Sequence, residues 1–401
     1  MRVLRLRELG EPVEEPLDGD VVAEFVAAGV VSAERSAVPG RWLVRAGTKV
    51  GVARLRDVEV WVAPKIEIER LFFLLGYARN LSGWREETVP FARREELLSA
   101  VALAFERQAA RATEQGLLQG YRDTEDSLPV LRGRLREAEQ VRRRFGLLVP
   151  LEVRFDEFTV DIAENRLLRG AAETLLHLPQ LPQAVRRGLV RLNARLADVS
   201  PLVRGRPRPE WRPTRLNARY HTALRLAEMI LDATSLGHER GELRAGAFLF
   251  DMARIFEEFL SAALTEALAP YGGVVQAQDT THSLDEAGSV RIRPDLVWYG
   301  DHGLPCAVID AKYKAERPST FPDADLYQLL AYCTALDLPV GHLVYAKGNE
   351  LEARHMVRNC GVELVQHALD LSLRPAPLLE QVRDIAERIA RTRAASAAIL
   401  A

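Results

Sequence analysis

Ionisable residues stand on two apolar, strand-like runs in the C-terminal part of the sequence. Asp295 follows Pro294 at the start of the run LVWY, and Asp310 and Lys312 stand two positions apart in PCAVIDAKYK. Side chains two positions apart in a strand point to the same face of a sheet. Burying such groups costs free energy unless they are paired or bind a metal. A hairpin pairing of the runs would therefore gather two carboxylates and one ammonium on one face.

This set of groups suits the hydrolysis of a phosphodiester. Carboxylate oxygens are ligands of Mg²⁺, a hard cation. The metal lowers the pKa of bound water and stabilises the charge that develops on the phosphate. A lysine beside it positions or activates the water and offsets anionic charge. We therefore predict that Asp295 and Asp310 bind Mg²⁺ and that Lys312 acts in catalysis.

The helical segments on either side of these runs offer further polar groups. Glu257 stands at the edge of the apolar stripe of the preceding helix, where it can lean toward the site as a third metal ligand. In LYQLLAY, Gln328 and Tyr332 are four positions apart and share one helix face. We expect both to reach back toward the lysine or a phosphate.

Each feature alone has an ordinary reading: an exposed strand face, a turn at the Pro-Asp pair, and amphipathic helices. Their order is more specific, because a helix with a glutamate, two strands with Pro-Asp and Asp-x-Lys, and a helix with Gln-x-x-x-Tyr follow one another. This order resembles the PD-(D/E)XK nuclease superfamily. The resemblance implies that Asp295, Asp310 and Lys312 are catalytic. Gln328 and Tyr332 match the extra motif of its exonuclease-like branch.

The bulk composition is that of an ordinary globular chain. Its 401 residues are 48% hydrophobic and 27% charged, and the formal net charge is -2. Any DNA binding must therefore come from local basic patches or a partner. The cysteines form no CxxC pair, which fits a reducing compartment. With no secretory signal and no apolar run of about 18 residues, we expect a cytoplasmic protein without a membrane span.

The pattern along the chain predicts an α+β protein with two domains. Period-two alternation up to about residue 70 indicates a β-rich N-terminal unit, and three- and four-residue spacing then indicates a mostly helical middle region. A proline-rich segment, VRGRPRPEWRPTR, places the boundary between residues 1–210 and 211–401. A long amphipathic helix is expected over FLFDMARIFEEFLSAALTEAL. The second domain is expected to be a nuclease-like α/β domain with a central mixed sheet flanked by helices.

Further stretches resemble one family, McrC, a subunit of modified-cytosine-dependent restriction systems. The matching segments run from about residue 50 to residue 345 and cover most of the chain: VEVWVAPKI, GLLQGY, LRGRL, FDEFTVDIAENRLL, TRLNARYHTALRLAEMIL and FLFDMARIFEEFL. Together they are more specific than the nuclease signature alone. The resemblance carries Asp295, Asp310 and Lys312 over as catalytic, with Glu257, Gln328 and Tyr332 in support.

The resemblance also implies a partner. McrC proteins work with McrB, an AAA+ GTPase that forms rings on DNA, and they stimulate its GTP hydrolysis and contribute the nuclease. This sequence contains no G-x-x-x-x-G-K-[ST] motif, so GTP is expected to bind to the partner. The resemblance therefore implies a DNA endonuclease subunit acting on double-stranded, methylated DNA with Mg²⁺.

The region that docks on the partner ring is expected before residue 210. We predict docking contacts from the family's N-terminal strand motif and from the basic stretch LRGRLREAEQVRRRFG: Lys65, Arg132, Arg134, Arg142, Arg143 and Arg144. One of these arginines is a candidate to act across the interface on the partner's GTP site. Contact with DNA, or a solvated face, is the alternative reading of the stretch.

Two other functions compete with the restriction subunit. A stand-alone Mg²⁺-dependent nuclease of DNA repair or recombination would use the same residues, but the N-terminal half carries no DNA-binding motif. A non-catalytic activator of an AAA+ partner would need no intact site, whereas Asp295, Asp310 and Lys312 are all present.

Overall fold

A computed structural model describes residues 1–78, 97–178, 181–203, 205–235, 247–300, 303–313, 323–346 and 353–400. It divides into two compact units. The first unit comprises Met1–Ala92, Arg240–Ala245 and Leu249–Ala401, and the second comprises Arg93–Glu239 and Gly246–Phe248. This division differs from the predicted boundary at residue 210. The N-terminal β region belongs with the C-terminal region, because α2 (Ile68–Ala78) packs along α8 (Met252–Leu268).

The N-terminal β region consists of two small sheets. One has the order β1 (Arg2–Arg7), β6 (Val58–Ala63), β5 (Lys49–Leu55) and β10 (Phe248–Asp251). The other has the order β2 (Val13–Glu15), β4 (Trp42–Ala46) and β3 (Val31–Arg35), with α1 (Gly19–Ala27) packed on β3. The β-rich N-terminal region predicted from period-two alternation is confirmed.

The sequence FLFDMARIFEEFL does not form one continuous helix. Its first residues are strand β10, and helix α8 begins only at Met252. Helix α8 begins there because the Asp251 side chain accepts a hydrogen bond from the backbone N–H of Ala253 at 3.0 Å and caps the helix. The expectation of a helix over this whole stretch is wrong for its first four residues.

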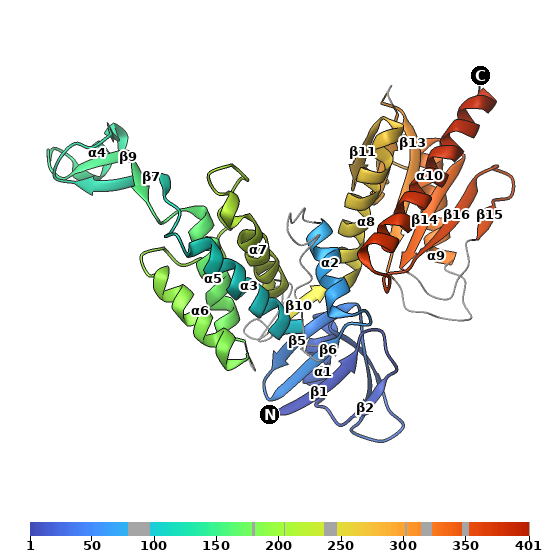
Figure 1. Cartoon of the computed structure of the whole chain (residues 1–401), viewed down its shortest axis with the longest axis horizontal. Helices are drawn as coiled ribbons and strands as arrows, with labels where there is room; N and C mark the ends of the chain where they lie inside the picture. The colour runs from blue at the N-terminus through green and yellow to red at the C-terminus, as the bar shows by residue number, and fades with distance from the viewer. Residues whose placement is uncertain are drawn as a thin grey trace. The chain divides into compact units, whose positions relative to one another are not determined.

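The second unit is a bundle of helices from which an arm extends. The bundle contains α3 (Leu97–Thr113), α5 (Ala163–Leu176), α6 (Gln183–Arg195) and α7 (His221–Ser235), with the 3-10 turn Ala218–Tyr220 before α7. The arm contains β7 (Gly120–Leu128), β8 (Arg134–Leu135), α4 (Glu137–Arg144) and β9 (Leu151–Thr159) (Figure 1). β7 and β9 pair antiparallel along their whole length, from Gly120 opposite Thr159 to Leu128 opposite Leu151. The mostly helical middle region therefore also carries a β arm.

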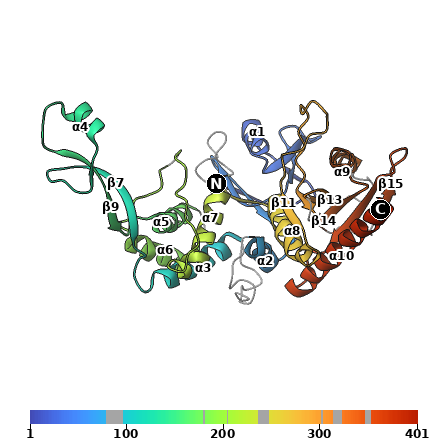
Figure 2. The ribbon, with the colours of Figure 1, turned by 90° about the horizontal axis from the view of Figure 1, so that it is seen from above.

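The C-terminal region is a mixed sheet with helices on both faces. Its strands have the order β11 (Val274–Ala277), β12 (Leu296–Tyr299), β13 (Pro305–Lys312), β14 (Val340–Ala346), β16 (Glu363–Leu369) and β15 (Arg354–Met356). β12 and β13 pair antiparallel, whereas β13, β14 and β16 are parallel. Helix α9 (Asp323–Leu336) covers one face, and α8 with α10 (Pro375–Leu400) covers the other (Figure 2). The 3-10 turn Ala269–Tyr271 follows α8.

The face under α9 has an apolar core. Val297 and Val308 from the strands meet Leu329 and Cys333 from the helix. Gly341 on β14 permits this approach, since a Cβ there would lie 2.5 Å from Sγ of Cys333. The mixed α+β character of the chain is confirmed. No helix among the described residues is long and apolar enough to cross a membrane.

Candidate active site

The strand pairing brings the two predicted aspartates together. Leu296 lies opposite Ile309 in the antiparallel pair of β12 and β13, so Asp295 and Asp310 come side by side at the end of the pair. Asp310 lies on the face under α9 and is 1% exposed. Lys312 follows two residues later on the same face. The cluster expected from the sequence is thus formed by local pairing.

Specific contacts fix these side chains. Oδ2 of Asp295 accepts a hydrogen bond from the backbone N–H of Ala311 at 2.8 Å, which ties the start of β12 to the end of β13. The ammonium of Lys312 forms an ion pair with Asp310, with 2.6 Å between Nζ and Oδ2. The lysine side chain remains partly exposed, whereas the Asp310 side chain is nearly fully buried. Asp310 is therefore the buried member of the cluster, and the half-buried Lys312 and Asp295 connect it to solvent.

The electrostatics of the cluster are those of two carboxylates in one buried site. Burial raises the pKa of Asp310, and the negative charge of Asp295 raises it further, against the effect of Lys312. Burial opposes the charge of Lys312, but the neighbouring carboxylate of Asp310 outweighs it and raises the pKa of the lysine. Two like charges in a dry site disfavour each other. A cation between them would remove that cost.

Glu257 on α8 is a third carboxylate that interacts electrostatically with Asp295 and Lys312. Burial raises its pKa to about 7, with a further contribution from the charge of Asp295, while Lys312 lowers it. Its neighbour Glu258 pairs instead with Arg254 on the helix surface, at 2.8 Å. Glu257 therefore leans toward the site, as the helical spacing predicts, and changes protonation near neutral pH.

The Gln-x-x-x-Tyr pair of α9 lies at the edge of the site. Nε2 of Gln328 donates to the Tyr332 hydroxyl at 2.9 Å, and that hydroxyl donates to the backbone carbonyl of Arg293 at 3.2 Å. Tyr332 is buried and Gln328 is exposed. Burial, and then the charge of Asp310, raises the pKa of Tyr332. The pair thus ties α9 to the segment that leads into Asp295.

Asp325 is a site residue that sequence reasoning missed. An aspartate near the start of a helix is typical of a cap, but Asp325 lies inside α9 and is 6% exposed. Its carboxylate accepts a hydrogen bond from the Tyr345 hydroxyl of β14 at 3.3 Å. The same charge contributes to the raised pKa of Lys312. Asp325 comes near Lys312 only because α9 packs on the sheet, and no local sequence pattern predicts this position.

Asp295 and Asp310 are the oxygen donors best placed to hold a divalent cation. No group of three His, Cys, Asp or Glu side chains among the described residues forms a ready site for a metal. Mg²⁺, however, is usually held through one or two carboxylates, with water and substrate phosphates completing its shell. The buried carboxylate of Asp310 and the half-buried one of Asp295 fit that cation, and Glu257 stands beside the pair as a further carboxylate.

The arginines predicted for partner docking lie on the arm, and three of them are engaged there. Oε1 of Glu152, which is 2% exposed, lies 3.1 Å from Nε of Arg144, and Arg143 approaches the other oxygen at 3.6 Å. Arg142 pairs with Glu139 at 2.7 Å. The pairs of Arg143 and Arg144 with Glu152 join α4 to β9, whereas the pair of Arg142 with Glu139 lies within α4. The first two arginines therefore have a structural role in the arm.

The remaining predicted docking residues differ in their surroundings. The Arg132 guanidinium lies 4.1 Å from the centroid of the Phe155 ring. Arg134 is exposed, and its side chain makes no hydrogen bond, ion pair or ring contact within the described part of the chain. Lys65 belongs to the first unit, where its Nζ lies 4.3 Å from the centroid of the Tyr313 ring. The residues that the sequence grouped together therefore belong to two different units.

Comparisons with known proteins identify the family. A chain in the half-complex of Thermococcus gammatolerans McrB AAA+ hexamers with bound McrC is 17% identical, with a TM-score of 0.58, over 96% of this chain and all of that one. A chain of the Thermococcus gammatolerans McrBC complex is 18% identical, with a TM-score of 0.40, over 66% of this chain and 88% of that one. The first likeness shows a shared fold. No curated protein matches the sequence. The family described as "McrBC 5-methylcytosine restriction system component" matches residues 44–346, and the chain therefore belongs to that family.

Proposed function

We propose that this protein is the DNA endonuclease subunit of a GTP-dependent restriction complex that acts on DNA carrying modified cytosine. The observation that supports this most directly is the cluster of Asp295, Lys312 and the buried Asp310 in a chain of the McrBC family. The arrangement of α8, the β12–β13 pair and α9 around these residues matches the order expected of a PD-(D/E)XK nuclease.

The residues of the site suggest a division of labour. Asp295 and Asp310 would hold Mg²⁺, which when bound lowers the pKa of water and offsets charge on the phosphate. Lys312, held at Asp310, places a positive charge beside the anionic transition state. Glu257, with a pKa of about 7, accepts a proton near neutral pH. Tyr332 fixes the segment that leads into Asp295.

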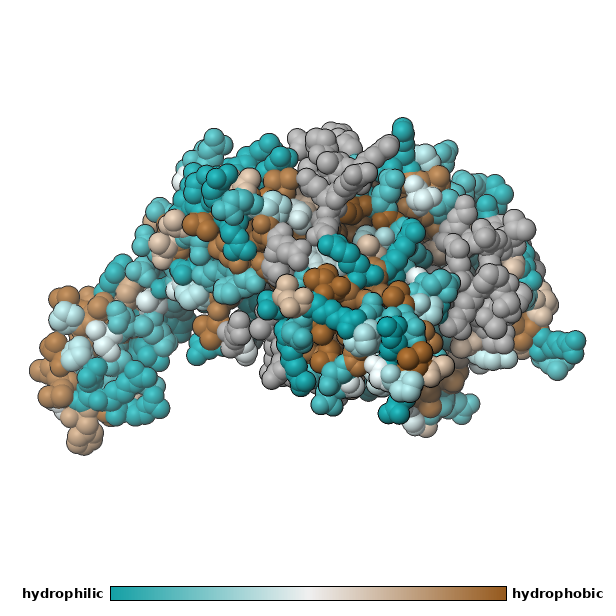
Figure 3. Space-filling model, turned by 90° about the horizontal axis from the view of Figure 1, so that it is seen from below, coloured by the Kyte–Doolittle hydropathy of each residue, from teal (hydrophilic) through white to brown (hydrophobic). Residues whose placement is uncertain are grey.

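The arm is the proposed docking element for an AAA+ GTPase ring. Its tip exposes a group of large apolar side chains (Figure 3), among them Phe145 at 90% and Leu148 at 85% exposure. Exposed apolar patches of this kind mark interaction sites. In the solved assembly that this fold resembles, McrC is bound to McrB AAA+ hexamers. By that likeness, the occupant of this tip is the ring of the partner GTPase.

The surroundings of the arginines single out one of them for action on the partner. An arginine that completes a GTP site in trans must have a side chain that is available to reach the partner's nucleotide. Arg142, Arg143 and Arg144 are tied to carboxylates, and Arg132 is stacked on a ring. Arg134 alone among the predicted arginines has no such contact in the described residues. We assign the trans-acting role to Arg134.

A cleavage assay with separated components tests the proposed function. The purified chain is incubated with methylated or unmethylated plasmid, with and without an McrB-type AAA+ GTPase from the same organism, GTP and Mg²⁺. The proposal expects cleavage of methylated plasmid only when partner, GTP and Mg²⁺ are all present. Cleavage by the chain alone would instead identify a stand-alone nuclease. GTPase stimulation without any cleavage would identify a non-catalytic activator.

A further inference from the structure

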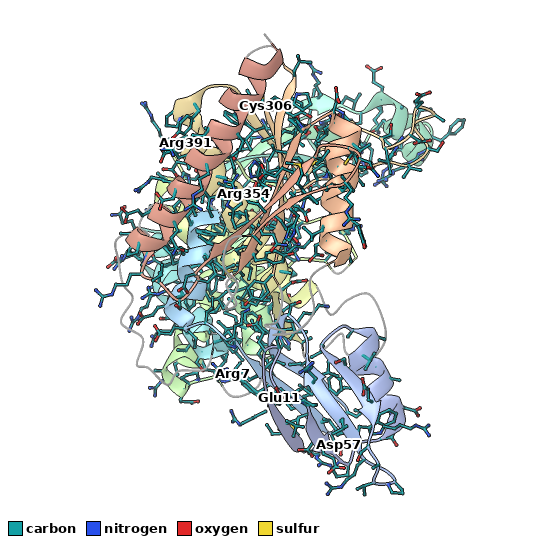
Figure 4. All side chains as sticks on the ribbon, turned by 90° about the vertical axis from the view of Figure 1, so that its right-hand side faces the viewer. Arg7, Glu11, Asp57, Cys306, Arg354 and Arg391 are labelled. Atoms are coloured by element: carbon teal, nitrogen blue, oxygen red, sulfur yellow. The ribbon has the colours of Figure 1, made fainter. Side chains whose placement is uncertain are left out.

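A buried carboxylate stands at the end of the N-terminal strand β1. Glu8 is 2% exposed, and its Oε2 accepts a hydrogen bond from the backbone N–H of Lys65 at 2.9 Å. Burial raises the pKa of Glu8, while Lys65 and the Tyr313 hydroxyl favour its charged form. A buried charge is costly unless specific partners hold it. Figure 4 labels Arg7, the preceding residue, at the end of the N-terminal β region that adjoins the rest of this unit.

The partner of this carboxylate comes from the catalytic strand. Tyr313, the residue after Lys312, is 6% exposed, and its hydroxyl is near enough to Glu8 for each group to shift the pKa of the other. Neither that hydroxyl nor Oε1 of Glu8 makes a regular hydrogen bond within the described residues. The ammonium of Lys65 lies over the same ring, 4.3 Å from its centroid. The Tyr313 ring thus contacts Lys65, and its hydroxyl lies near Glu8, so two residues of the N-terminal region adjoin it.

These contacts lie on the side of β13 that faces α8, opposite the side that carries the catalytic groups. Tyr313 directly follows the last residue of β13, and its ring turns toward α8, which covers the face opposite that of Asp310 and Lys312. Its ring packs on Phe256 of α8, with 6.0 Å between the ring centroids. Lys312 and Glu257 are the chain neighbours of Tyr313 and Phe256. A shift of this contact would therefore move two site residues without touching them.

We propose that Glu8, Lys65 and Tyr313 form a joint through which the N-terminal β region positions the catalytic strand, and that they are positioning residues for Lys312. This inference rests on the proposed nuclease function. It gives Lys65 a task inside the chain, where its ammonium holds the Tyr313 ring. Docking at the partner ring is left to the arm.

Substitutions of Lys65 and Tyr313 test the joint in the complete complex with partner, GTP and Mg²⁺. Lys65→Met removes the ammonium but keeps the stem, and Tyr313→Leu removes the ring. Each is expected to lower kcat for DNA cleavage about tenfold, while KM for DNA and GTPase stimulation stay within about twofold of wild type. Lys65→Arg, which keeps a cation over the ring, is expected to restore most of the rate. The double variant should be no worse than the poorer single variant.

Arg35→Met is the matched control, because Arg35 lies over Trp42 in the second small sheet, 5.8 Å from the ring centroid. It removes a comparable cation–π contact outside the joint and should leave cleavage unchanged. Cleavage at wild-type rate in both Lys65→Met and Tyr313→Leu would overturn the inference. So would a parallel loss of GTPase stimulation in Lys65→Met, since that would place Lys65 at the partner.

A readout independent of cleavage separates this inference from the proposed function. Hydrogen exchange of the β13 amides in the isolated chain should be faster in Lys65→Met than in wild type and unchanged in Arg35→Met. If wild type does not cleave DNA but this difference is present, the nuclease proposal fails and the joint stands. Equal exchange in all three chains would reject the joint.

Discussion

The ammonium of Lys312 lies 2.6 Å from Oδ2 of Asp310, and both side chains project from the same face of β13. The aspartate is buried at the end of the strand pair, whereas the lysine reaches partly into solvent. The lysine can therefore turn from the carboxylate to an incoming phosphate without leaving the site. A metal held by Asp310 would release it for that task.

Replacing Lys312 should remove cleavage without removing the partner's activation. Lys312→Met keeps the apolar stem and deletes the charge, so cleavage should fall at least about a hundredfold, the range of one electrostatic donor in a dry site. GTPase stimulation should remain near wild type, because the arm is intact. Initial rates of plasmid cleavage and phosphate release measure the two effects. A cleavage rate of Lys312→Met within about threefold of the wild-type rate would show that Lys312 does not act in catalysis.

The raised pKa values predict a specific dependence of stability on pH in the metal-free chain. The pKa of Glu257 is about 7. Burial, and then the charge of Asp295, also raises the pKa of Asp310. A carboxyl whose pKa is raised by folding stabilises the fold below its unfolded pKa, and this contribution is lost as pH rises through about 7. Relative to Asp310→Asn, the free energy of unfolding of wild type should fall by on the order of 1 kcal/mol between about pH 5 and pH 8.

Thermal unfolding of both chains across this pH range measures the difference. Added Mg²⁺ should raise the stability of the wild-type chain at pH 8. The gain should be smaller at pH 6, where protons compete with Mg²⁺ for the same carboxylate oxygens. The Asp310→Asn chain should respond weakly to Mg²⁺ at either pH. A wild-type chain that gains stability over Asp310→Asn as pH rises would contradict the assigned environment of the site.

Arg134 is expected to act on the partner's nucleotide. Arg134→Ala should lower GTP hydrolysis by the complex at least about tenfold, in the direction known for arginines acting in trans. Arg132→Ala serves as the control, since that side chain is stacked on Phe155 and should matter much less to turnover. Complex formation by Arg134→Ala should persist, because the apolar tip is unchanged. Equal GTPase rates in the two variants would reject the assignment.

The close approach of α9 to β14 predicts a steric limit at Gly341. A Cβ at this position would lie 2.5 Å from Sγ of Cys333 and 2.9 Å from Cγ of Leu329. Gly341→Ala should therefore destabilise the chain by about 1–3 kcal/mol, as overpacked core substitutions do. At Gly19, the nearest atom would be 3.8 Å away, and Gly19→Ala should be nearly neutral. Chemical denaturation of the two variants tests this difference.

The parts of the site that the sequence predicted are those fixed by local geometry. The two-residue spacing of Asp310 and Lys312 guarantees a shared face in any strand, and a hairpin suffices to bring Asp295 beside them. The four-residue spacing of Gln328 and Tyr332 likewise gave a hydrogen-bonded pair. Such relationships need no knowledge of distant packing.

The parts that escaped prediction depend on contacts between segments distant in sequence. The place of Asp325 follows from the packing of α9 on the sheet, where Tyr345 donates to it. Residues Phe248–Asp251 form a strand because they complete a sheet beside β5, although their apolar run equally suits a helix. The contact of Lys65 with Tyr313 joins two residues that follow strands of separate sheets. In each case the partner decides the structure, and the local pattern does not.

The most direct test of the central claim uses Asp310→Asn in the assembled complex. This variant keeps the shape of the side chain but removes the charge that would hold Mg²⁺ and pair with Lys312. DNA cleavage and GTP hydrolysis are followed in one reaction on methylated plasmid. The account predicts that cleavage disappears while GTP hydrolysis continues at the wild-type rate. Cleavage that persists in Asp310→Asn would show that the nuclease site lies elsewhere.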